Sequence, residues 1–479
     1  MLPLRLSLWQ ILFAILAVFW QSMNCLGLTM RRLYNIFFNV FFLLSSPYYF
    51  LRMWRRGNWQ EGFSQRFGKY SSKVKQAVSN RHVLWMHAVS VGEVNVATQL
   101  VRALEPRLPN LKIVISTTTT TGMGELNKKF PSHIQKIYYP IDRQNGVTRA
   151  LMTIHPQVIV LVEAEIWPNF LWRAREMHIP LFLVNARLSE RSYRGYRRFG
   201  FLFRPIFASF AGVGCQNEQD AQRLRELGCR PETIHIVGNL KFDSAKLDER
   251  RVVDVPAILR QLGVPEGARL LIGGSTHAGE EGVLAEIFLR LKPRFPELFL
   301  VVAPRHFERG KEVGKELGAR GVKFAYRSEM SVTSRYAPNS IECLLLNTTG
   351  ELKYFYEHAA AIFVGKSLTV EGGQNPIEPG ALGKAMVFGS HMQNFEAVAR
   401  RFVEQQGALQ VKDAAGLELA LAQILSDDAL AAELGRNAVR VVWENSGAID
   451  RTVDMIVENL DGSPIYVAPK PEPLKSDAS

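Results

Sequence analysis

The sequence lacks the residue patterns that mark several large classes of protein. Its four cysteines are scattered through 479 residues without a Cys-x-x-Cys pair, which argues against a disulfide framework and a zinc site. No Asp-x-Asp and no His/Cys/Asp cluster with metal-ligand spacing occurs. Gly122-Met-Gly124 begins like a dinucleotide fingerprint, but Asn127 stands where the third glycine is needed. We therefore expect no metal, no cofactor and no nicotinamide chemistry.

The composition is that of a folded, basic protein with more than one domain. Hydrophobic residues make up 47% and charged residues 22% of the chain, which is typical of a globular protein. The net charge of +13 indicates an anionic partner, such as a phosphorylated substrate or a phospholipid surface. Beyond the N-terminal region no Lys/Arg stripe carries interleaved aromatic residues, so we expect no nucleic acid partner.

Two uncharged segments near the N-terminus are candidate membrane spans. Residues 6–30 and 33–51 are each long enough for a spanning helix, which needs ~20 residues, although Asn35, Asn39 and Pro47 interrupt the second. The basic residues that follow predict a cytoplasmic body by the positive-inside rule. They are Arg52, Arg55, Arg56, Arg66, Lys69, Lys73 and Lys75.

The pair Arg31-Arg32 limits how these segments can be arranged. Two full spans would place this pair outside the cell, against the positive-inside rule, so we expect only one segment to span. Met30 is a candidate start of translation, and residues 1–29 are then a candidate extension of the true protein. A cleaved signal peptide is disfavoured, because no clear small-x-small site follows the apolar stretch.

From residue 83 onward, strand patterns and helix patterns alternate along the chain. Residues 158–163 form a continuous apolar run, as a parallel strand buried on both faces requires. A charged stretch with two prolines, residues 248–265, separates this series from a second one. Strands of the second series are expected near residues 270–273, 298–303, 341–347, 360–365 and 385–388. This alternation of strand and helix patterns predicts an α/β protein with two doubly wound domains that face a cleft.

These patterns divide the chain into four regions. The stretch from residue 414 to 460 is largely helical, and the last residues are rich in proline and lysine and are expected to be disordered. The expected regions are a membrane anchor over residues 1–60, a first domain over 61–250, a second domain over 251–460 and a tail over 461–479.

A carboxylate lies at the first strand-to-helix turn. Residues 83–87 read as a buried strand, and apolar positions at helical spacing predict a helix over residues 94–104. Glu93 falls where the strand's carboxyl end meets the helix's amino end, the place where open α/β sheets bind ligands. Ser90-Val-Gly-Glu93 also matches a capping box, in which Glu93 serves only the helix. Taken by themselves, these residues favour the capping role.

Three loops of the second series follow strand ends and carry groups suited to a nucleotide. The first, residues 274–281, contains a histidine and two glutamates. The second contains Arg305, which can make two-pronged contacts with a phosphate or a base. In the third, Gly372-Gly373 lets the backbone approach a ligand closely.

The third loop continues into a predicted helix start. Asn375 can cap this helix and Pro376 can open it, so that free N–H groups face a phosphate. Glu378, one turn further, is placed to bind ribose hydroxyls. Together with Arg305 on a neighbouring loop, these residues predict a nucleotide site.

Residues 187–204 combine arginine with aromatic side chains. The stretch fits a solvated helix face over a core, and it fits equally a surface for anionic lipid or phosphate. The residues concerned are Arg187, Arg191, Tyr193, Arg194, Tyr196, Arg197, Arg198, Phe199, Phe201, Phe203 and Arg204.

Nine short motifs resemble, in their order along the chain, those of the bacterial 3-deoxy-D-manno-octulosonic acid (Kdo) transferases of lipopolysaccharide synthesis, and the resemblance extends from about residue 30 to residue 450. Nine ordered motifs are far more specific than any one of them. They are His87-Ala-Val-Ser-Val-Gly-Glu93, Glu163-Ala-Glu-Ile-Trp-Pro-Asn169, Asn185-Ala-Arg-Leu-Ser189, Gln216-Asn-Glu218, Gly238-Asn-Leu-Lys-Phe-Asp243, Ser275-Thr-His-Ala-Gly-Glu280, Pro304-Arg-His306, Thr349-Gly-Glu-Leu352 and Gly372-Gly-Gln-Asn-Pro-Ile-Glu378.

The resemblance implies a GT-B fold of two Rossmann-like domains and an N-terminal membrane helix. It implies an inner-membrane location with the catalytic body on the cytoplasmic side. The donor would be CMP-Kdo, bound by residues 251–460, and the acceptor a phosphorylated lipid A precursor (lipid IVA), bound by residues 61–250. Transfer would be inverting and metal-independent, with inner-membrane lipid as a further partner.

The resemblance also implies roles for single residues. Glu93 would be the general base that takes the proton from the acceptor hydroxyl, while Glu163 and Lys241 would support the transition state. CMP would be bound by Pro304, Arg305, Thr349, Gly350, Glu351, Asn375, Pro376, Ile377 and Glu378. Two positions depart from the family pattern, since Gln374 replaces a histidine and Ala278 a glutamate. Gln374 can form hydrogen bonds but cannot carry a positive charge.

Other interpretations stay open on sequence grounds. One is a different GT-B enzyme of the cell envelope that uses another nucleotide sugar, or a sugar-nucleotide epimerase. Another is a membrane-tethered binding protein with a degenerate site. The presence of Glu93, Glu163, Lys241 and Arg305 together disfavours the binding protein, and the choice between CMP and UDP separates the enzymes.

Overall fold

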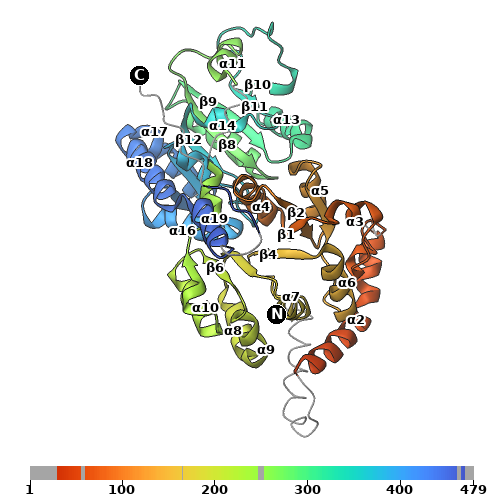
Figure 1. Ribbon diagram of the computed structural model, residues 1–479. Coiled ribbons are helices and arrows are strands. Elements are labelled where there is room, and N and C mark those ends of the chain that lie inside the picture. The colour runs from red at the N-terminus through yellow and green to blue at the C-terminus, as the bar shows by residue number, and fades with distance from the viewer. Residues whose placement is uncertain (1–29, 56–59, 164, 246–252, 461–464, 470–479) are drawn as a thin grey trace. The chain divides into compact units, whose positions relative to one another are not determined.

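The protein divides into two compact units (Figure 1), and the structure, a computed structural model, describes residues 30–55, 60–163, 165–245, 253–460 and 465–469. Unit 1 comprises Met1–Leu240 and Gly447–Ser479, and unit 2 comprises Lys241–Ser446. Most of the first candidate membrane span and the candidate extension lie outside the described residues, as does most of the expected tail.

In the described part of the chain, unit 1 is built on a parallel sheet of seven strands in the order β3-β2-β1-β4-β5-β6-β7. Helices cover both faces, so the central strands β1 and β4 are almost continuously apolar. Val83 and Trp85 enter the core on one face, and Leu84 and Met86 enter the core on the other. The strands are β1 (His82–His87), β2 (Leu111–Thr117), β3 (Gln135–Tyr138), β4 (Pro156–Val162), β5 (Leu181–Ala186), β6 (Gly212–Cys215) and β7 (Ile234–Ile236).

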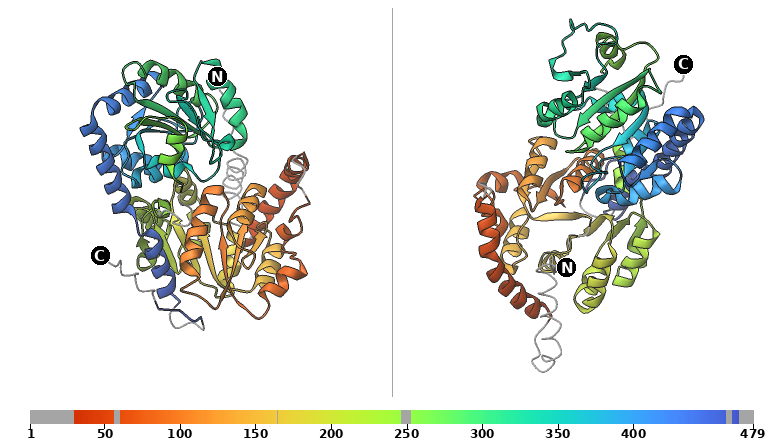
Figure 2. Two further views of the ribbon diagram at one scale, coloured as in Figure 1. Left: turned by 90° about the horizontal axis from the view of Figure 1, so that it is seen from above. Right: turned by 180° about the vertical axis from the view of Figure 1, so that it is seen from behind.

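The helices of unit 1 form a layer on each face of its sheet (Figure 2). One layer contains α4 (Val91–Leu104), α5 (Thr120–Lys129) and α19 (Ala448–Glu458). The other contains α2 (Met30–Arg55), α3 (Ser72–Val78), α6 (Gln144–Ile154), α7 (Pro168–Glu176), α8 (Glu190–Arg198), α9 (Gly200–Phe207) and α10 (Glu218–Leu227).

Helix α2 contains the whole of the second candidate span, residues 33–51, and packs one of its sides against the core of unit 1. Tyr34 and Phe38 are buried in the core, whereas Leu43 and Leu44 are 71% and 76% exposed. Among the described residues, no helix has both the length and the hydropathy needed to cross a membrane. The expected membrane-spanning helix stays a prediction.

In the described part of unit 2, a second parallel sheet of seven strands has the order β10-β11-β9-β8-β12-β13-β14. Its strands are β8 (Arg269–Thr276), β9 (Leu298–Pro304), β10 (Phe324–Tyr326), β11 (Cys343–Leu345), β12 (Ala359–Val364), β13 (Met386–Gly389) and β14 (Leu409–Val411). Its helices are α11 (Val255–Gln261), α12 (Glu280–Leu291), α13 (Gly310–Ala319), α14 (Leu352–Tyr356), α15 (Ile377–Ala381), α16 (Glu396–Glu404), α17 (Ala414–Ser426) and α18 (Asp428–Asn445).

The last helix, α19, differs from the expected domain plan, which placed residues up to 460 in the second domain. Val453 and Ile456 of α19 pack in the core of unit 1, and Asp454 pairs with Arg107 at 3.0 Å. Unit 2 accordingly runs from Lys241 to Ser446, and the chain returns to unit 1 after it. An apolar helix face predicts burial, but it does not say which of two sheets buries it.

Each sheet reverses its winding at one point, between β1 and β4 in unit 1 and between β8 and β12 in unit 2. The loops that follow the two strands at such a point leave toward opposite faces, and open α/β folds bind ligands there. Glu93 and Glu163 follow β1 and β4, while His277 and Lys366 follow β8 and β12. Each unit therefore carries candidate residues at the ligand-binding edge of its own sheet.

Candidate active site

Glu93 lies in the first turn of α4, where it closes a capping box. The Ser90 hydroxyl accepts the Glu93 N–H at 3.2 Å. The Glu93 carboxylate accepts the Ser90 N–H at 3.3 Å and the Val89 N–H at 2.8 Å. The capping geometry expected from the sequence is confirmed. A carboxylate has about four lone-pair sites, so these two bonds leave room for a proton.

The surroundings of Glu93 raise the pKa of its carboxyl group to about 7. Burial is the main cause, since the residue is only 8% exposed. The carboxylates of Glu163 and Glu165 raise the pKa further, while the hydrogen bond from the Val89 N–H lowers it. A carboxylate with a pKa near neutrality is suited to accept a proton and release it again.

Glu163 and Glu165 bring two more carboxylates to the same edge of the sheet. Glu163 follows β4 directly at φ 61°, an uncommon conformation for a residue with a side chain. Glu165 accepts the indole N–H of Trp167 at 2.8 Å. Burial, and then Glu163, raises the pKa of the Glu165 carboxyl group. Glu165 had no predicted role, and its only sequence signal is its place in the Glu163-Ala-Glu165 motif.

A neutral aromatic pair borders these carboxylates. The His87 ring stacks on Tyr139 with a centroid distance of 3.8 Å, and its Nδ1 lies 2.9 Å from the Ser116 hydroxyl. Burial lowers the pKa of His87 to about 3, so the ring is uncharged at neutral pH. Burial and then nearby carboxylates, including Glu165, raise the pKa of the Tyr139 hydroxyl. The His87–Tyr139 pair therefore adds two packed, uncharged rings to this edge of the sheet and no charge.

Lys241 belongs to unit 2, whereas Glu93 and Glu163 belong to unit 1. It lies in a short 3-10 helix, Leu240–Ala245. Its Nζ donates to the Asn394 carbonyl at 3.2 Å and lies 5.4 Å from the centroid of the Phe395 ring. The role of Lys241 in the transition state stays a prediction.

In unit 2, one buried carboxylate ties the loop after β8 to the loop after β12. One oxygen of Glu280 accepts the N–H groups of His277 at 2.9 Å and Lys366 at 2.7 Å. The other oxygen accepts those of Ser367 at 2.9 Å and Leu368 at 3.0 Å. Glu280 is fully buried, so these four bonds replace its hydration. Glu280 ends the Ser275-to-Glu280 motif, but the sequence alone predicted no role for it.

Basic side chains gather around Glu280 and the two loops that it joins, which together are called the Glu280 clamp below. Pro304 ends β9, and Arg305 follows it with an exposed side chain. The rings of His277 and His306 meet edge to face, with centroids 5.7 Å apart. Burial and then the surrounding cations, Lys366 first, lower the pKa of His277 to about 4. The edge is therefore electropositive while His277 is neutral, and it suits an anionic ligand.

The predicted nucleotide contact Thr349-Gly350-Glu351 forms the turn before α14. Gly350 adopts φ 84°, which favours glycine. Glu351 is buried, pairs with Arg327 at 3.0 Å and accepts the Thr348 hydroxyl at 2.6 Å. Its carboxylate is therefore engaged within the protein, and the exposed Thr349 and Gly350 are left to contact a ligand.

The segment from Asn375 to Glu378 is organised differently from the expected helix start. The Asn375 side-chain oxygen accepts the Ile377 N–H at 3.0 Å, and its amide donates to Glu378 at 3.2 Å. Pro376 precedes α15, and α15 has only five residues, too short for a strong helix dipole. Burial raises the pKa of the Glu378 carboxyl group, and Asn375 and Arg305 oppose this shift. The side chains of this segment, rather than a helix terminus, are its candidate ligand groups.

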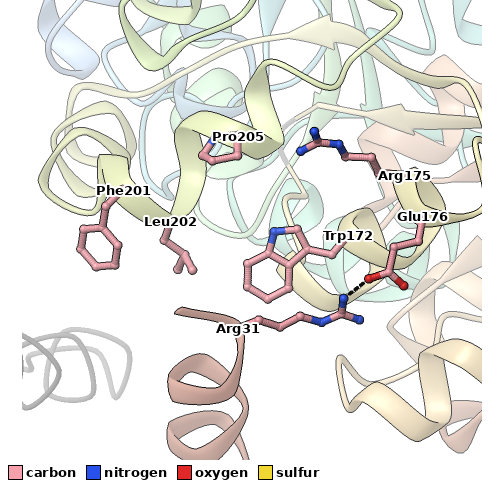
Figure 3. Close-up of a pocket in the computed structure, with 7 residues that line it drawn as sticks. All are labelled: Arg31, Trp172, Arg175, Glu176, Phe201, Leu202 and Pro205. Atoms are coloured by element: carbon pink, nitrogen blue, oxygen red, sulfur yellow. Dashed lines mark hydrogen bonds and ion pairs between the residues drawn. The ribbon is translucent and has the colours of Figure 1, made fainter. Parts of the chain in front are cut away.

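The basic aromatic stretch forms helices α8 and α9, beside two surface hollows of unit 1. Its aromatic residues Tyr193 and Phe203 are buried, so the stretch does cover a core. One hollow of about 460 Å³ is lined by Arg31, Trp172, Arg175, Glu176, Phe201, Leu202 and Pro205 (Figure 3), with Arg31 paired to Glu176. The other, of about 700 Å³, is lined by Arg197, Arg198, Gly200, Phe201, Arg204, Pro205, Ala208, Glu226, Leu227 and Gly228. Both hollows combine cations with apolar side chains.

Two Rossmann-like units, each with its candidate residues at a switch point, define an α/β protein of the GT-B class. The fold is similar to that of UDP-GlcNAc 2-epimerase from Neisseria meningitidis bound to UDP-GlcNAc. That likeness has a TM-score of 0.52 at 14% identity and covers 79% of this chain and 99% of the other. The fold is also similar to that of a glycosyltransferase from Rickettsia africae ESF-5, with a TM-score of 0.51 at 13% identity.

Sequence relatives narrow the class to one family. Residues 61–244 match the family model described as 3-Deoxy-D-manno-octulosonic-acid transferase (kdotransferase). The 3-deoxy-D-manno-octulosonic acid transferase of Haemophilus influenzae is 30% identical over 406 residues, 84% of this chain and 92% of that protein. The enzyme of the same name from Bordetella pertussis is 32% identical over 429 residues, 87% of this chain and 97% of the relative. The chain belongs to the 3-deoxy-D-manno-octulosonic acid transferase family, and it is a glycosyltransferase.

Proposed function

We propose that this enzyme transfers Kdo from CMP-Kdo to a phosphorylated lipid A precursor, with inversion, without a metal ion and with Glu93 as general base. The observation that carries the proposal is a buried carboxylate at the switch point of unit 1, with its pKa raised to about 7. Family membership supports the choice of sugar and donor. The electropositive edge of unit 2 supports a negatively charged nucleotide sugar.

The proposed chemistry uses Glu93 in one proton transfer. Glu93 takes the proton of an acceptor hydroxyl while the hydroxyl oxygen forms a bond to the anomeric carbon of the sugar. The anomeric C–O bond to the phosphate breaks on the opposite face, and CMP leaves with the electron pair. Cations of the donor site stabilise the charge on the departing phosphate. Glu163 and Lys241 support this transition state, and Arg305 with Asn375 to Glu378 binds CMP.

We further propose that the enzyme works at the cytoplasmic face of the inner membrane. The exposed apolar residues of α2, among them Leu43 and Leu44, support insertion into the headgroup region. The cation-lined hollows beside α9 support contact with phosphorylated lipid, as does the net charge of +13. An acceptor that is both acylated and phosphorylated would meet both kinds of surface.

The test is a direct transfer assay. The full-length enzyme is incubated with CMP-Kdo and lipid IVA, and mass spectrometry counts the sugars added to the lipid. We expect a mass increase of whole Kdo units, release of CMP and no loss of activity in EDTA. A lipid of unchanged mass with a folded enzyme contradicts the assignment, and complete loss in EDTA that added metal restores contradicts the metal-free mechanism.

A second candidate is a GT-B enzyme with another nucleotide sugar. The likeness of the fold to a UDP-GlcNAc enzyme makes UDP the nucleotide to compare. A thermal-shift panel of CMP, UDP, GDP and cytidine separates the two candidates. We expect CMP to raise the melting temperature most, because binding to the native state alone stabilises it.

A further inference from the structure

Lys366 has an unusual backbone conformation at the switch point of unit 2. It lies two residues after the end of β12, beyond Gly365, and adopts φ 55°, in the left-handed region where residues with a side chain are uncommon. Holding such a residue costs about 1 kcal/mol relative to glycine, and such strain tends to occur at functional sites. The backbone conformation alone would favour glycine at this position, so the presence of a lysine side chain needs a separate explanation.

The Glu280 clamp is what holds Lys366 in this conformation. A single Glu280 oxygen accepts the N–H groups of both Lys366 and His277, which sets the two residues side by side. The Lys366 carbonyl accepts the Gly373 N–H at 2.7 Å, so the loop is fixed from its other side as well. The side chain of Lys366 thus starts from a rigid base.

The ammonium group of Lys366 lies against the Gly372-Gly373 turn. A Cβ atom at Gly372 would come within 3.0 Å of the Lys366 Nζ and 2.8 Å of its Cε. Gly372 itself adopts φ 136°, so glycine is needed there both for its backbone and for the space that the lysine fills. This turn leads directly into the Asn375 to Glu378 segment of the candidate nucleotide site.

The charge of Lys366 has no counterion in the described part of the chain, where no carboxylate lies within ion-pair distance of its Nζ. Of the nearby acids, Glu280 is saturated by four N–H groups and Glu281 is paired with Arg309 at 2.7 Å. Lys366 is also the first of the cations that depress the pKa of His277. An ammonium group that is half-buried among other cations is suited to bind an anion.

We propose that Lys366 binds an oxyanion of the nucleotide sugar in the donor site, either a phosphate oxygen or the sugar carboxylate. The inference rests on the proposed function and adds a residue that the family motifs quoted above do not contain. It also accounts for the strained backbone: glycine would suit the conformation better, but only a long cationic side chain supplies the charge. The Gln374 side chain, which contacts His277 at 3.4 Å, leaves this loop with a hydrogen-bonding group in place of a second cation.

Two variants separate charge from backbone conformation. Lys366→Met removes the ammonium group and keeps a side chain, whereas Lys366→Gly removes the charge and relieves the backbone strain. Lys315→Met, on the exposed face of α13, is the matched control for loss of one lysine in unit 2. Binding of CMP and of cytidine is measured by calorimetry, and the KM for CMP-Kdo is measured by transfer assay.

We expect both Lys366 variants to weaken CMP binding, or to raise the KM for CMP-Kdo, about 10- to 100-fold, the usual effect of losing a charged hydrogen bond. Weaker CMP binding assigns the lysine to the phosphate, and a raised KM with normal CMP binding assigns it to the sugar carboxylate. Cytidine binding should not change, since cytidine carries no anion. Lys366→Gly should melt at or above the wild-type temperature, and Lys315→Met should behave as wild type.

The proposal is overturned if both Lys366 variants bind CMP and turn over CMP-Kdo as Lys315→Met does. It is also overturned if cytidine binding falls as much as CMP binding, because the effect is then not one of charge. A wild-type enzyme that binds UDP in place of CMP refutes the proposed donor. The same variants then decide the role of Lys366 with UDP as the probe.

Discussion

At the scale of the single residue, Glu93 combines an observed structural role with the proposed role of general base. Its carboxylate caps α4 through the N–H groups of Val89 and Ser90. Burial at this position raises the pKa of the carboxyl group to about 7. The geometry confirms the capping role expected from the sequence, and it is compatible with the proposed catalytic role. The cap fixes the carboxylate at the edge of the sheet without using all of its lone pairs.

The pH dependence of transfer should report the ionisation of Glu93. A general base acts only when ionised, so kcat/KM should rise as the pH rises through about 7 and level off above it. Because the Glu165 carboxylate raises the pKa of Glu93, Glu165→Gln should move this rise to lower pH. The measurement is a pH–rate profile from pH 5 to 9.

The control for this profile is Glu105→Gln, which removes a carboxylate from the far end of the same helix. Glu105 pairs with His133 on the surface, so its loss should leave the profile in place. A Glu165→Gln profile that coincides with that of wild type, or moves to higher pH, contradicts the electrostatic account of Glu93.

At the scale of the element, a buried aspartate ties α2 to α7. Asp142 is 1% exposed and accepts the Tyr34 hydroxyl of α2 at 2.8 Å. It also accepts the N–H groups of Asn169 and Phe170, both at 2.9 Å, in the first turn of α7. Helix α7 begins directly after the Glu163-to-Trp167 segment. The hydrogen bonds of Asp142 therefore link α2 to the edge of the sheet that carries Glu163 and Glu165.

Tyr34→Phe should loosen α2 without changing the shape of the core. The lost hydrogen bond to a buried carboxylate is worth about 1.5–3 kcal/mol. We expect faster amide hydrogen exchange in α2 and in the first turn of α7, and little change in β1. Hydrogen exchange followed by mass spectrometry measures each segment separately.

Tyr70→Phe is the matched control for this change. Tyr70 is buried in the same core, but its hydroxyl donates to the Tyr138 carbonyl over a longer distance, 3.4 Å. Its loss should cost little and should not affect α2. Equal exchange in α2 for the two variants contradicts the proposed tie through Asp142.

The two helix layers of unit 1 also show what an element's sequence leaves open. Residues 94–104 were expected to be a helix and lie within α4, Val91–Leu104. The C-terminal helix α19 was expected as well, but its apolar face did not reveal that it packs on unit 1. The edge strands β3, β10 and β14 have only three or four residues each, too few for a strand pattern to be recognised.

At the scale of the whole molecule, the charge and the exposed face of α2 predict binding to anionic bilayers. We expect the full chain to bind vesicles that contain anionic lipid, and to bind them less at high salt. Leu43→Ser combined with Leu44→Ser should weaken this binding several-fold, because both side chains are largely exposed on α2. Co-sedimentation with vesicles measures the bound fraction.

Leu419→Ser is the control, since Leu419 is 73% exposed on α17 of unit 2. It should bind vesicles as wild type does. A double α2 variant that binds no worse than Leu419→Ser excludes this face of α2 as the membrane contact.

The fold was more predictable than the site. Continuous apolar runs such as residues 158–163 gave the central strands, because burial on both faces leaves a clear pattern in the sequence. The strand ends then placed Glu93 and Arg305 at the ligand-binding edges. The Glu280 clamp, the left-handed Lys366 and the influence of Glu165 on Glu93 could not be predicted, because each depends on a contact between distant segments. Motif spacing also did not show that Glu351 is engaged by Arg327.

The central claim, that Glu93 is the general base of Kdo transfer, is tested most directly by the turnover of Glu93→Gln. Glutamine keeps an oxygen to cap α4 but cannot accept the proton. We predict that kcat with CMP-Kdo and lipid IVA falls about 10²- to 10⁴-fold, with melting temperature and CMP affinity close to wild type. Ser90→Ala, which loses about 1 kcal/mol of capping, should keep most of its turnover. A Glu93→Gln enzyme that turns over within a few-fold of wild type would contradict the account.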